Sequence, residues 1–503
     1  MKKKILLVEP DAVVEIIGRS SRGDKEQHVP LSSLDGTDFF TQEIFEALQN
    51  GEAEIAVHSL KDMSATHFFS HHAFAIVDRE DVRDVAIFNP NVIQKINDGL
   101  PLFIGTCSPR RELMAMQFLK KGLPQLHQEI IIETKPIRGN VEGRLIQLNE
   151  GKYDGTILAA AGLNRLLEAE IAEGIQNDPD SVTSLLKDKR LMFLPLIECV
   201  PAPCQGAIVA EADPSNPMAV EVIKKINDEQ LLKEVIAEKR KAYQYGSGCL
   251  QKFGVVTLHT SNGNYLYAAG DDKEGNAFSE WSPLPELRIS VDQIFSTTDS
   301  MKDFFNYEWS DKKINIAEPS VFVANYKALM QEGLRDVLNE KQVWASGTKT
   351  WYELAKLGVW VAGSADALGF EHWLPMLNMP LIHQSAEDVC ILTHEAAVAR
   401  WKQKARKAVS NYRLIPSNSE SVQNKISEAK AVFWSSYAQY EYYGKYVADN
   451  AVHICAGGES AERLRQAGVD PVIFPTIKSF DAWRKSVPLP RKDAIGQTNI
   501  SGS

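Results

Sequence analysis

Short apolar runs alternate with helix-like stretches through the first 300 residues. The apolar runs have the length and bounding residues of strands, and the segments between them have helical periodicity. This alternation predicts an α/β fold with mostly parallel sheets. The expected strands are EIAVH (54–58), PLFIG (101–105), EIIIET (129–134) and TILAAAG (156–162).

Between residues 250 and 290 the pattern changes to alternating polar and apolar positions around turn signals. The stretch 253–278 is interrupted at Asn262-Gly263 and at Asp271-Asp272. It predicts antiparallel hairpins in a small α+β domain. The polar stretch 297–312 is expected to be a linker.

The last part of the chain contains an internal repeat. VFVANY (321–326) resembles VFWSSY (432–437), and SGTKTWYELAKLG (346–358) resembles GGESAERLRQAG (457–468). We expect two Rossmann-like halves, each with a Gly-led turn that opens a helix, and a cleft between them. Duplication for stability alone is the alternative.

Composition narrows the class of protein. Hydrophobic residues make up 44% of the 503 residues and charged residues 24%, which argues against a disordered or collagen-like chain. No apolar run reaches the length of a membrane helix, and the apolar start is too short for a secretory signal, so a cytoplasmic protein is expected. The net charge of −11 disfavours a non-specific nucleic-acid binder but permits a local basic pocket.

The cysteines are too few for a disulfide scaffold, and none forms a CxxC pair, so neither a metal site nor a redox pair is expected. They are Cys107, Cys199, Cys204, Cys249, Cys390 and Cys455.

Cationic side chains recur where the expected strands end and helices begin. Ser108 suits an N-cap and Pro109 the first helical position, so Arg110 and Arg111 fall in a first turn, where the helix dipole disfavours cations. A bound anion would explain them. Taken singly, each cation could be a solvated surface charge, but together they predict a small ligand with several carboxylates or phosphates. The set is Lys61, Arg110, Arg111, Arg138, Arg144 and Arg165.

Two further residues could carry chemistry. Asp62, beside Lys61, suits a general acid/base or a stabiliser of positive charge, and a simple ion pair with an arginine is equally compatible. Cys249 lies in the glycine loop YGSGCLQKFG (245–254), after an expected helix at 231–243, where a thiol is accessible to covalent chemistry. An inert small residue is the alternative there.

Seven motifs in order resemble hydroxymethylbilane synthase, also called porphobilinogen deaminase, across about 290 residues. They are HSLKDM (58–63), DREDVRDV (78–85), GTCSPRR (105–111), IRGNVEGRL (137–145), GKYDGTILAAAGLNRL (151–166), VPAPCQGAI (200–208) and GSGC (246–249).

The resemblance implies three domains. The first comprises residues 1–82 and 193–215, the second residues 83–192, and the third residues 216–300. The first two would resemble type II periplasmic binding proteins and share two crossing connections. The third would carry a dipyrromethane cofactor on Cys249 through a thioether.

The implied reaction is a transferase step of haem biosynthesis. Four porphobilinogen units are added head to tail with release of ammonia, and water then frees hydroxymethylbilane. Asp62 would be catalytic and would stabilise the cationic azafulvene. Cofactor binding would fall to Lys61, Arg110, Arg111, Thr106, Ser108 and Gln205, and substrate binding to Arg138, Asn140, Arg144 and Arg165. A monomer without metal, nucleic-acid or membrane partners is expected.

The chain departs from the family pattern at several places. VVEIIGRSSRGD (13–24) resembles the family's second strand, so the usual opening strand and helix are expected to be missing or reduced to residues 1–12. A glycine-rich loop loses its lysine at Asp35-Gly36-Thr37-Asp38. Further replacements are Ser64, Cys107, Pro109, Cys204 and Lys252.

Residues 310–495 resemble uroporphyrinogen-III synthase, a lyase that closes hydroxymethylbilane into a ring without a cofactor. The Gly-x-x-Thr helix turns and FWSS (433–436) carry this resemblance, and lobes at about 310–388 and 389–490 are expected. The expected cleft residues are Gly347, Thr350, Ser435, Ser436, Tyr437, Gly457 and Ser460. Core packing is the alternative role for Tyr437.

The leading hypothesis is therefore a bifunctional fusion of two consecutive enzymes. A deaminase with a degenerate C-terminal module is one alternative, and a non-catalytic binder of anionic pyrroles is another. The glycine-flanked Cys249 argues against the binder, because binding alone needs no covalent anchor.

Overall fold

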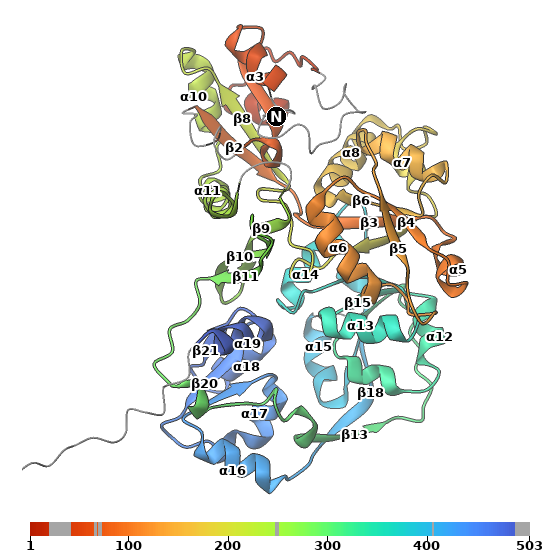
Figure 1. Cartoon of the computed structure of the whole chain (residues 1–503), viewed down its shortest axis with the longest axis vertical. Coiled ribbons are helices and arrows are strands. Elements are labelled where there is room, and N and C mark those ends of the chain that lie inside the picture. Colours follow the sequence, from red (N-terminus) through yellow and green to blue (C-terminus); the bar gives the residue numbers. More distant parts are fainter. Residues whose placement is uncertain (20–41, 65–67, 69–72, 247–250, 405–406, 488–503) are drawn as a thin grey trace, which may run out of the picture. The chain divides into compact units, whose positions relative to one another are not determined.

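The computed structural model describes residues 1–19, 42–64, 68, 73–246, 251–404 and 407–487 (Figure 1). The chain divides into two compact units. The first contains residues 1–258, 266–280 and 309–412, and the second contains residues 259–265, 281–308 and 413–503. Within the described residues, no helix combines the length and the apolarity that crossing a bilayer requires.

The first sheet of the chain is antiparallel, with strand order β1-β8-β2. Its strands are β1 (Ile55–Ser59), β8 (Ala207–Ala212) and β2 (Phe74–Arg79). Alternate residues of β2 and β8 pack on opposite faces: one face meets α11 (Glu229–Tyr245) and the other α10 (Pro217–Lys225). The prediction of a mostly parallel sheet is wrong here, because β8 returns from another sheet and enters between β1 and β2 in the opposite direction.

The second sheet is mixed, with strand order β5-β4-β6-β3-β7. β4 runs parallel to β5 and β6, whereas β3 runs antiparallel to β6 and β7. The strands are β3 (Asp84–Phe88), β4 (Leu102–Gly105), β5 (Ile132–Lys135), β6 (Gly155–Ala159) and β7 (Arg190–Phe193). The helices are α5 (Val92–Asn97), α6 (Pro109–Gly122), α7 (Val141–Asn149), α8 (Ala160–Glu173) and α9 (Val182–Leu185). The alternation predicted from the sequence is confirmed where α6, α7 and α8 each follow a strand.

Two chain crossings join these sheets. Residues 80–83 connect β2 to β3, and residues 194–206 connect β7 to β8. Both crossings are bound to each other, for example by the Gln205 side-chain amide, which donates to the Val82 carbonyl at 2.7 Å. We refer to them below as the first and second crossing.

A third sheet, with order β11-β10-β9, follows α11. Its strands are β9 (Phe253–Thr260), β10 (Gly263–Asp271) and β11 (Ala277–Ser282). The turn between β9 and β10 falls at Asn262-Gly263, as the sequence predicts, and Gly263 has a φ of +133°, which suits glycine.

The fourth sheet has strand order β13-β18-β17-β14-β15-β16, and its described pairings from β18 to β16 are parallel. The strands are β13 (Phe305–Trp309), β14 (Ser320–Val323), β15 (Gln342–Ala345), β16 (Val361–Ser364), β17 (Val389–His394) and β18 (Lys407–Pro416). The helices are α12 (Leu334–Asn339), α13 (Thr348–Lys356), α14 (Phe370–Leu377) and α15 (Val398–Lys404). Strand pairing thus extends this lobe beyond residue 388, and β13 occupies part of the expected linker 297–312.

The fifth sheet, in the second unit, is parallel with order β12-β19-β20-β21. Alternate residues of β19 pack into two cores, so both faces of the sheet are covered. Its strands are β12 (Ile294–Ser296), β19 (Ala431–Trp434), β20 (Val452–Ala456) and β21 (Val472–Phe474). Its helices are α16 (Glu420–Glu428), α17 (Tyr437–Tyr443), α18 (Glu459–Gln466) and α19 (Ile477–Ser486). β12 lies in the stretch expected to close the third domain, so that boundary differs too. The Rossmann-like assignment of both lobes stays a prediction.

Candidate functional site

The turn after β4 places two arginines at the start of α6. The Ser108 hydroxyl caps the helix by accepting the Arg111 backbone N–H at 3.4 Å, and Pro109 occupies the first turn, as predicted. The Thr106 hydroxyl accepts the Ser108 N–H at 3.1 Å. Each hydroxyl therefore accepts a local amide and keeps its own hydrogen available for donation.

Both arginines are buried and bind one carboxylate, that of Asp84. Arg110 Nη2 and Arg111 Nη2 each donate to Asp84 at 2.8 Å, to different oxygens. The Gln205 amide adds a third donor at 3.0 Å. Burial alone would raise the pKa of Asp84, but the two guanidinium groups hold that pKa well below its usual range. Asp84 therefore stays ionised and fixes the turn.

These contacts exclude the surface-charge alternative for Arg110 and Arg111, which are only 5% and 8% exposed. Each also donates to one backbone carbonyl, from Arg110 to Val200 at 2.7 Å and from Arg111 to Ile157 at 2.8 Å. Arg111 Nε is buried without a hydrogen-bond partner among the described atoms. Contacts within the protein therefore hold both side chains in place.

Lys61 and Asp62 lie in a single 3₁₀ turn, η2 (Leu60–Asp62), directly after β1. Lys239 of α11 is buried and donates to the carbonyls of Leu60 at 3.0 Å and Met63 at 2.5 Å, which fixes both ends of the turn. The Lys61 side chain is exposed by area, yet the surrounding protein lowers its pKa, and repulsion from arginines adds to this effect while Asp62 opposes it.

The next strand end supplies Arg138 and Arg144. Asn140 caps α7 by accepting the Gly143 N–H at 2.9 Å, and Arg144 Nε donates to the Gly139 carbonyl at 2.8 Å. The pKa of Arg144 is lowered, first by burial and then by repulsion from Arg111 and Arg138, while Asp62 opposes the shift. Arg144 is therefore close enough to respond to charges from two other strand ends, those of β1 and β4.

These mutual effects define a cation cluster, by which we mean Lys61, Arg110, Arg111, Arg138 and Arg144 with the carboxylates Asp62 and Asp84. Among the described residues, Lys61 and Arg144 form no ion pair, so the cluster offers positive charge that suits a ligand with several carboxylates. Arg165 is engaged elsewhere: its Nη2 donates to the Gly206 carbonyl at 2.7 Å and lies 3.5 Å from Asp78.

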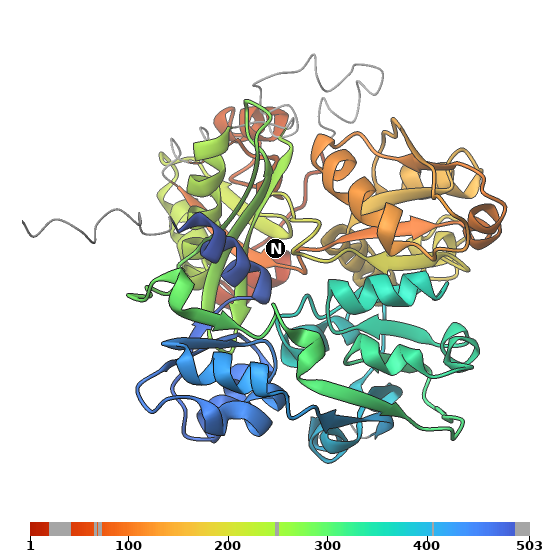
Figure 2. The same ribbon diagram turned by 60° about the horizontal axis from the view of Figure 1, so that its bottom comes forward.

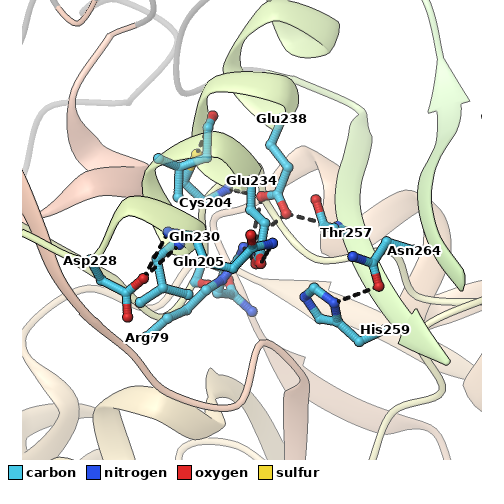
Figure 3. A network of polar contacts seen from close by, with 12 residues as sticks. Arg79, Cys204, Gln205, Asp228, Gln230, Glu234, Glu238, Thr257, His259 and Asn264 are labelled. Carbon is cyan, nitrogen blue, oxygen red and sulfur yellow. Dashed lines mark hydrogen bonds and ion pairs between the residues drawn. The ribbon is translucent and has the colours of Figure 1, made fainter. Parts of the chain in front are cut away.

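Cys249 lies outside the described residues, as does the loop 35–38. The helix that leads to this cysteine, α11, is anchored by Glu238, which is fully buried (Figure 3). Glu238 accepts two bonds from Arg79 at 2.9 Å and the backbone N–H groups of Cys204 and Thr257, both at 2.7 Å. The carboxylate thus ties α11 to the end of β2, to the second crossing and to β9.

Asp84, Glu238 and Lys239 are site residues that were not predicted from the sequence. Asp84 lies within the motif DREDVRDV, where it could have been recognised. Glu238 and Lys239 occupy adjacent positions of α11 and gave no separate signal, because a charged pair on a helix is usually solvated.

The thiols described in the structure are poor nucleophiles. Burial raises the pKa of Cys204, Cys390 and Cys455 to about 12, and raises that of Cys199 as well. Cys107 is half-buried and donates to the Ile137 carbonyl at 3.2 Å. Among the described residues, no group of three or more His, Cys, Asp or Glu side chains could hold a metal ion.

The residues expected in the C-terminal cleft fall in both units. In the first unit, Gly347 precedes α13, and the hydroxyl of the buried Thr350 lies 3.2 Å from that of Ser346. Gly347 rather than Thr350 is the N-cap. The cleft between the lobes stays a prediction.

In the second unit, the Ser435 hydroxyl donates to Gln439 at 2.8 Å and accepts from Thr297 at 3.1 Å, while Ser436 caps α17. Tyr437 is half-buried against the core, and the guanidinium of Arg463 lies 3.7 Å from the centre of its ring. The remaining two cleft candidates are Gly457, whose N–H donates to the Phe474 carbonyl at 2.8 Å, and Ser460 in the first turn of α18.

Comparisons with known proteins agree with the geometry of the N-terminal half. Residues 2–220 match the family described as "Porphobilinogen deaminase, dipyromethane cofactor binding domain". Porphobilinogen deaminase of Streptococcus sanguinis is 33% identical over 260 residues, which cover 51% of this chain and 75% of that protein. The enzyme of Acidithiobacillus ferrooxidans is 35% identical over 251 residues, covering 50% of this chain and 72% of the relative.

Solved structures add no argument about the fold. Protein PG110 from Staphylococcus aureus aligns with 49% of this chain and 87% of its own at 12% identity, with a TM-score of only 0.24. The sequence relatives and the family match carry the assignment, which concerns the N-terminal half and the dipyrromethane-binding domain within it. This chain belongs to the porphobilinogen deaminase family.

Proposed function

We propose that the chain is a hydroxymethylbilane synthase that condenses four porphobilinogen units on a dipyrromethane primer attached to Cys249. The observation that carries this proposal is the cation cluster, whose members come from three strand ends and alter one another's pKa. Each pyrrole of the growing chain brings two carboxylates, so the product is a polyanion that needs a positive site.

The roles divide according to how each cation is held. Arg110 and Arg111 are committed to Asp84 and shape the site, and one N–H of Arg111 has no partner within the described part of the chain. Lys61 and Arg144 form no ion pair among the described residues, which leaves their charge for ligand carboxylates. Arg138 lies near Arg144, because its repulsion helps to lower the pKa of Arg144.

The polar residues support the cations. Ser108 and Asn140 cap their helices and Thr106 accepts the Ser108 N–H, and all three keep donors for a carboxylate. Gln205 does not, because its side-chain amide donates to Val82 and to Asp84, so we assign it to holding Asp84. Arg165 similarly holds the second crossing through Gly206.

Asp62 would act on the reacting unit. When bound, the cofactor would supply the pyrrole carbon to which the first unit is joined, and each later unit would be joined to the terminal pyrrole of the growing chain. The Asp62 carboxylate, fixed in the turn that Lys239 braces, would stabilise the positive charge that develops as ammonia leaves and would accept or return the proton of the pyrrole N–H.

A second activity, uroporphyrinogen-III synthase, is proposed for the C-terminal lobes. It is supported by the repeat of parallel strands, in which a glycine follows both β15 and β20, and by the hydroxyl network of Ser435, Thr297 and Gln439.

Intact-mass analysis of the full chain, purified from a host that makes porphobilinogen, tests the first activity. We expect a mass increase of two pyrrole units that is lost in Cys249→Ala and kept in Cys107→Ala. A wild-type chain that carries no added mass would contradict the proposal. For the second activity, porphobilinogen should yield the type III ring isomer, and formation of only the type I isomer would refute it.

A further inference from the structure

The C-terminal lobe of the first unit shares its hydrophobic core with the second sheet of the deaminase half. One buried cluster includes Val85 and Phe193 of that sheet together with Trp344 and Trp373 of the C-terminal lobe. The rings of Phe193 and Trp344 lie 6.1 Å apart. Figure 2 shows the helices of the two regions, α6 and α13, beside each other, and Trp351 of α13 donates to the Gly122 carbonyl at 2.9 Å. The lobe is therefore packed onto the deaminase half rather than tethered to it.

One residue of this lobe reaches both chain crossings. Asp366 lies in the turn after β16 and is 1% exposed. Its Oδ1 accepts the backbone N–H of Leu196, in the second crossing, at 2.9 Å. Its Oδ2 lies 3.3 Å from Nη2 of Arg83, in the first crossing. A single carboxylate thus joins the two segments that connect the deaminase sheets.

The surroundings of Asp366 are built to hold this geometry. Asp366 and Ala367 have left-handed φ values of 54° and 58°, which non-glycine residues rarely adopt. The Ser364 hydroxyl accepts the backbone N–H of Asp366 and donates to Oδ1 of the same residue, which closes the turn. On the opposite side, Arg83 is held by Asp81 at 2.5 Å and approaches His372 Nε2 at 3.2 Å.

Arg83 is adjacent in the sequence to a member of the cation cluster. The following residue, Asp84, binds Arg110, Arg111 and Gln205. The carbonyl of Arg83 accepts the N–H of Ala160, and that of Asp84 accepts the N–H of Leu194. A shift of Arg83 would therefore move the residue that fixes both arginines, and would move the second crossing with it.

We infer that Asp366 is a positioning residue for the deaminase half, through which the C-terminal lobe fixes both crossings and thereby the relative placement of the two sheets. One sheet carries Lys61 and Asp62, and the other carries the arginines of the cluster. A chain that lengthens between them needs this placement maintained or adjusted at each addition. The functional part of this inference rests on the proposed synthase activity, whereas the structural part does not.

The test uses hydrogen exchange and kinetics on the full chain with three variants. Asp366→Ala removes both contacts, and Asp366→Asn keeps an oxygen for the Leu196 N–H but removes the charge that faces Arg83. Asp388→Asn is the matched control, because its carboxylate also accepts a backbone N–H, that of Ser385 at 2.8 Å, within the same lobe.

In Asp366→Ala we expect about tenfold faster exchange of the Leu196 amide and faster exchange of peptides from both crossings. Porphobilinogen turnover should fall about tenfold with KM changed less than about twofold, and intact mass should show accumulation of incompletely extended chains. Asp366→Asn should fall between this variant and the wild type, and Asp388→Asn should match the wild type.

Unchanged exchange at both crossings in Asp366→Ala would overturn the inference, as would the same change in Asp388→Asn. Altered exchange with turnover equal to that of the control would overturn the positioning role. A wild-type chain without turnover would refute the proposed function, and exchange would still decide whether Asp366 fixes the crossings.

Discussion

Two fully buried aspartates lie at the chain crossings, and their environments push their pKa values in opposite directions. Asp84 meets two guanidinium groups at 2.8 Å and an amide, and its pKa is lowered. For Asp366, burial raises the pKa from 3.8 to about 6. Its single guanidinium partner, at 3.3 Å, does not reverse this shift, and repulsion from Asp81 adds to it. Since both carboxylates are buried, the number and distance of their cationic partners determine whether the pKa is raised or lowered.

The difference separates two kinds of tie at the same crossings. The Asp84 network belongs wholly to the deaminase half, and its carboxylate has a pKa well below the usual range. The Asp366 tie comes from the C-terminal lobe and changes its charge near neutral pH. One is thus a fixed element of the site, and the other responds to conditions.

Removing Asp84 gives the largest expected effect. Asp84→Ala leaves Arg110 and Arg111 buried without their carboxylate, so the free energy of unfolding should fall by about 3–5 kcal/mol. Urea denaturation monitored by tryptophan fluorescence measures this. Asp78→Ala, which loses only a half-exposed pair with Arg165 at 3.5 Å, should cost less than about 1 kcal/mol. Equal losses in the two variants would erase the distinction between a fixed network and an ordinary ion pair.

The pH dependence of stability should reveal Asp366. Its folded pKa lies above the unfolded value, so between about pH 4 and pH 6 the folded chain binds more protons than the unfolded chain. As the pH rises from about 4 to about 6, the free energy of unfolding should therefore decrease by at most about 3 kcal/mol. Above pH 6 it should level off. Asp84 has the opposite sign and should cost stability only as the pH falls below about 4.

Asp366→Asn provides the check, because its side chain does not titrate. The difference between its unfolding free energy and that of the wild type should change over pH 4–6 and stay constant above. A difference that is flat from pH 4 to pH 8 would show that Asp366 titrates normally.

Local structure followed closely from the sequence, whereas pairing between distant segments did not. The strand–helix alternation predicted α6, α7 and α8, and the cap at Ser108 and the turn at Asn262-Gly263 are present. The direction of β8 was not predictable, because it depends on where the second crossing re-enters the first sheet. The apolar run 156–162 shows a further limit, since it divides into β6 and the start of α8.

The same limit applies to the site. Residue types and positions identified the cations, because charge at a strand end is a local signal. Their partners were missed, because Asp84 reaches Arg110 across 26 residues and Asp366 reaches Arg83 across 283. A motif points to candidate ligand-binding side chains, but only the fold shows which carboxylates already neutralise them.

Substitution of Lys239 tests whether the turn that contains Lys61 and Asp62 needs the hydrogen bonds from this side chain. Lys239→Met removes the donor to the carbonyls of Leu60 and Met63, which should cost about 1–3 kcal/mol of stability and lower porphobilinogen turnover about tenfold. Lys233→Met, on the exposed side of the same helix, is the control and should change neither quantity. Normal turnover in Lys239→Met would mean that the crossings alone hold the turn.

The smallest expected effect concerns a second contact between the same two regions, that of Trp351 with Gly122. Trp351→Phe removes the bond from the indole N–H to the Gly122 carbonyl, whereas Trp344→Phe removes an indole N–H that has no partner among the described atoms. Because both rings are fully buried, the difference between the two losses of stability isolates that hydrogen bond, at about 1 kcal/mol. Exchange of the Leu196 amide should stay at the wild-type rate in both variants. Faster exchange in Trp351→Phe would show that any loosening of the lobe reaches the crossings, and the special role of Asp366 would be lost.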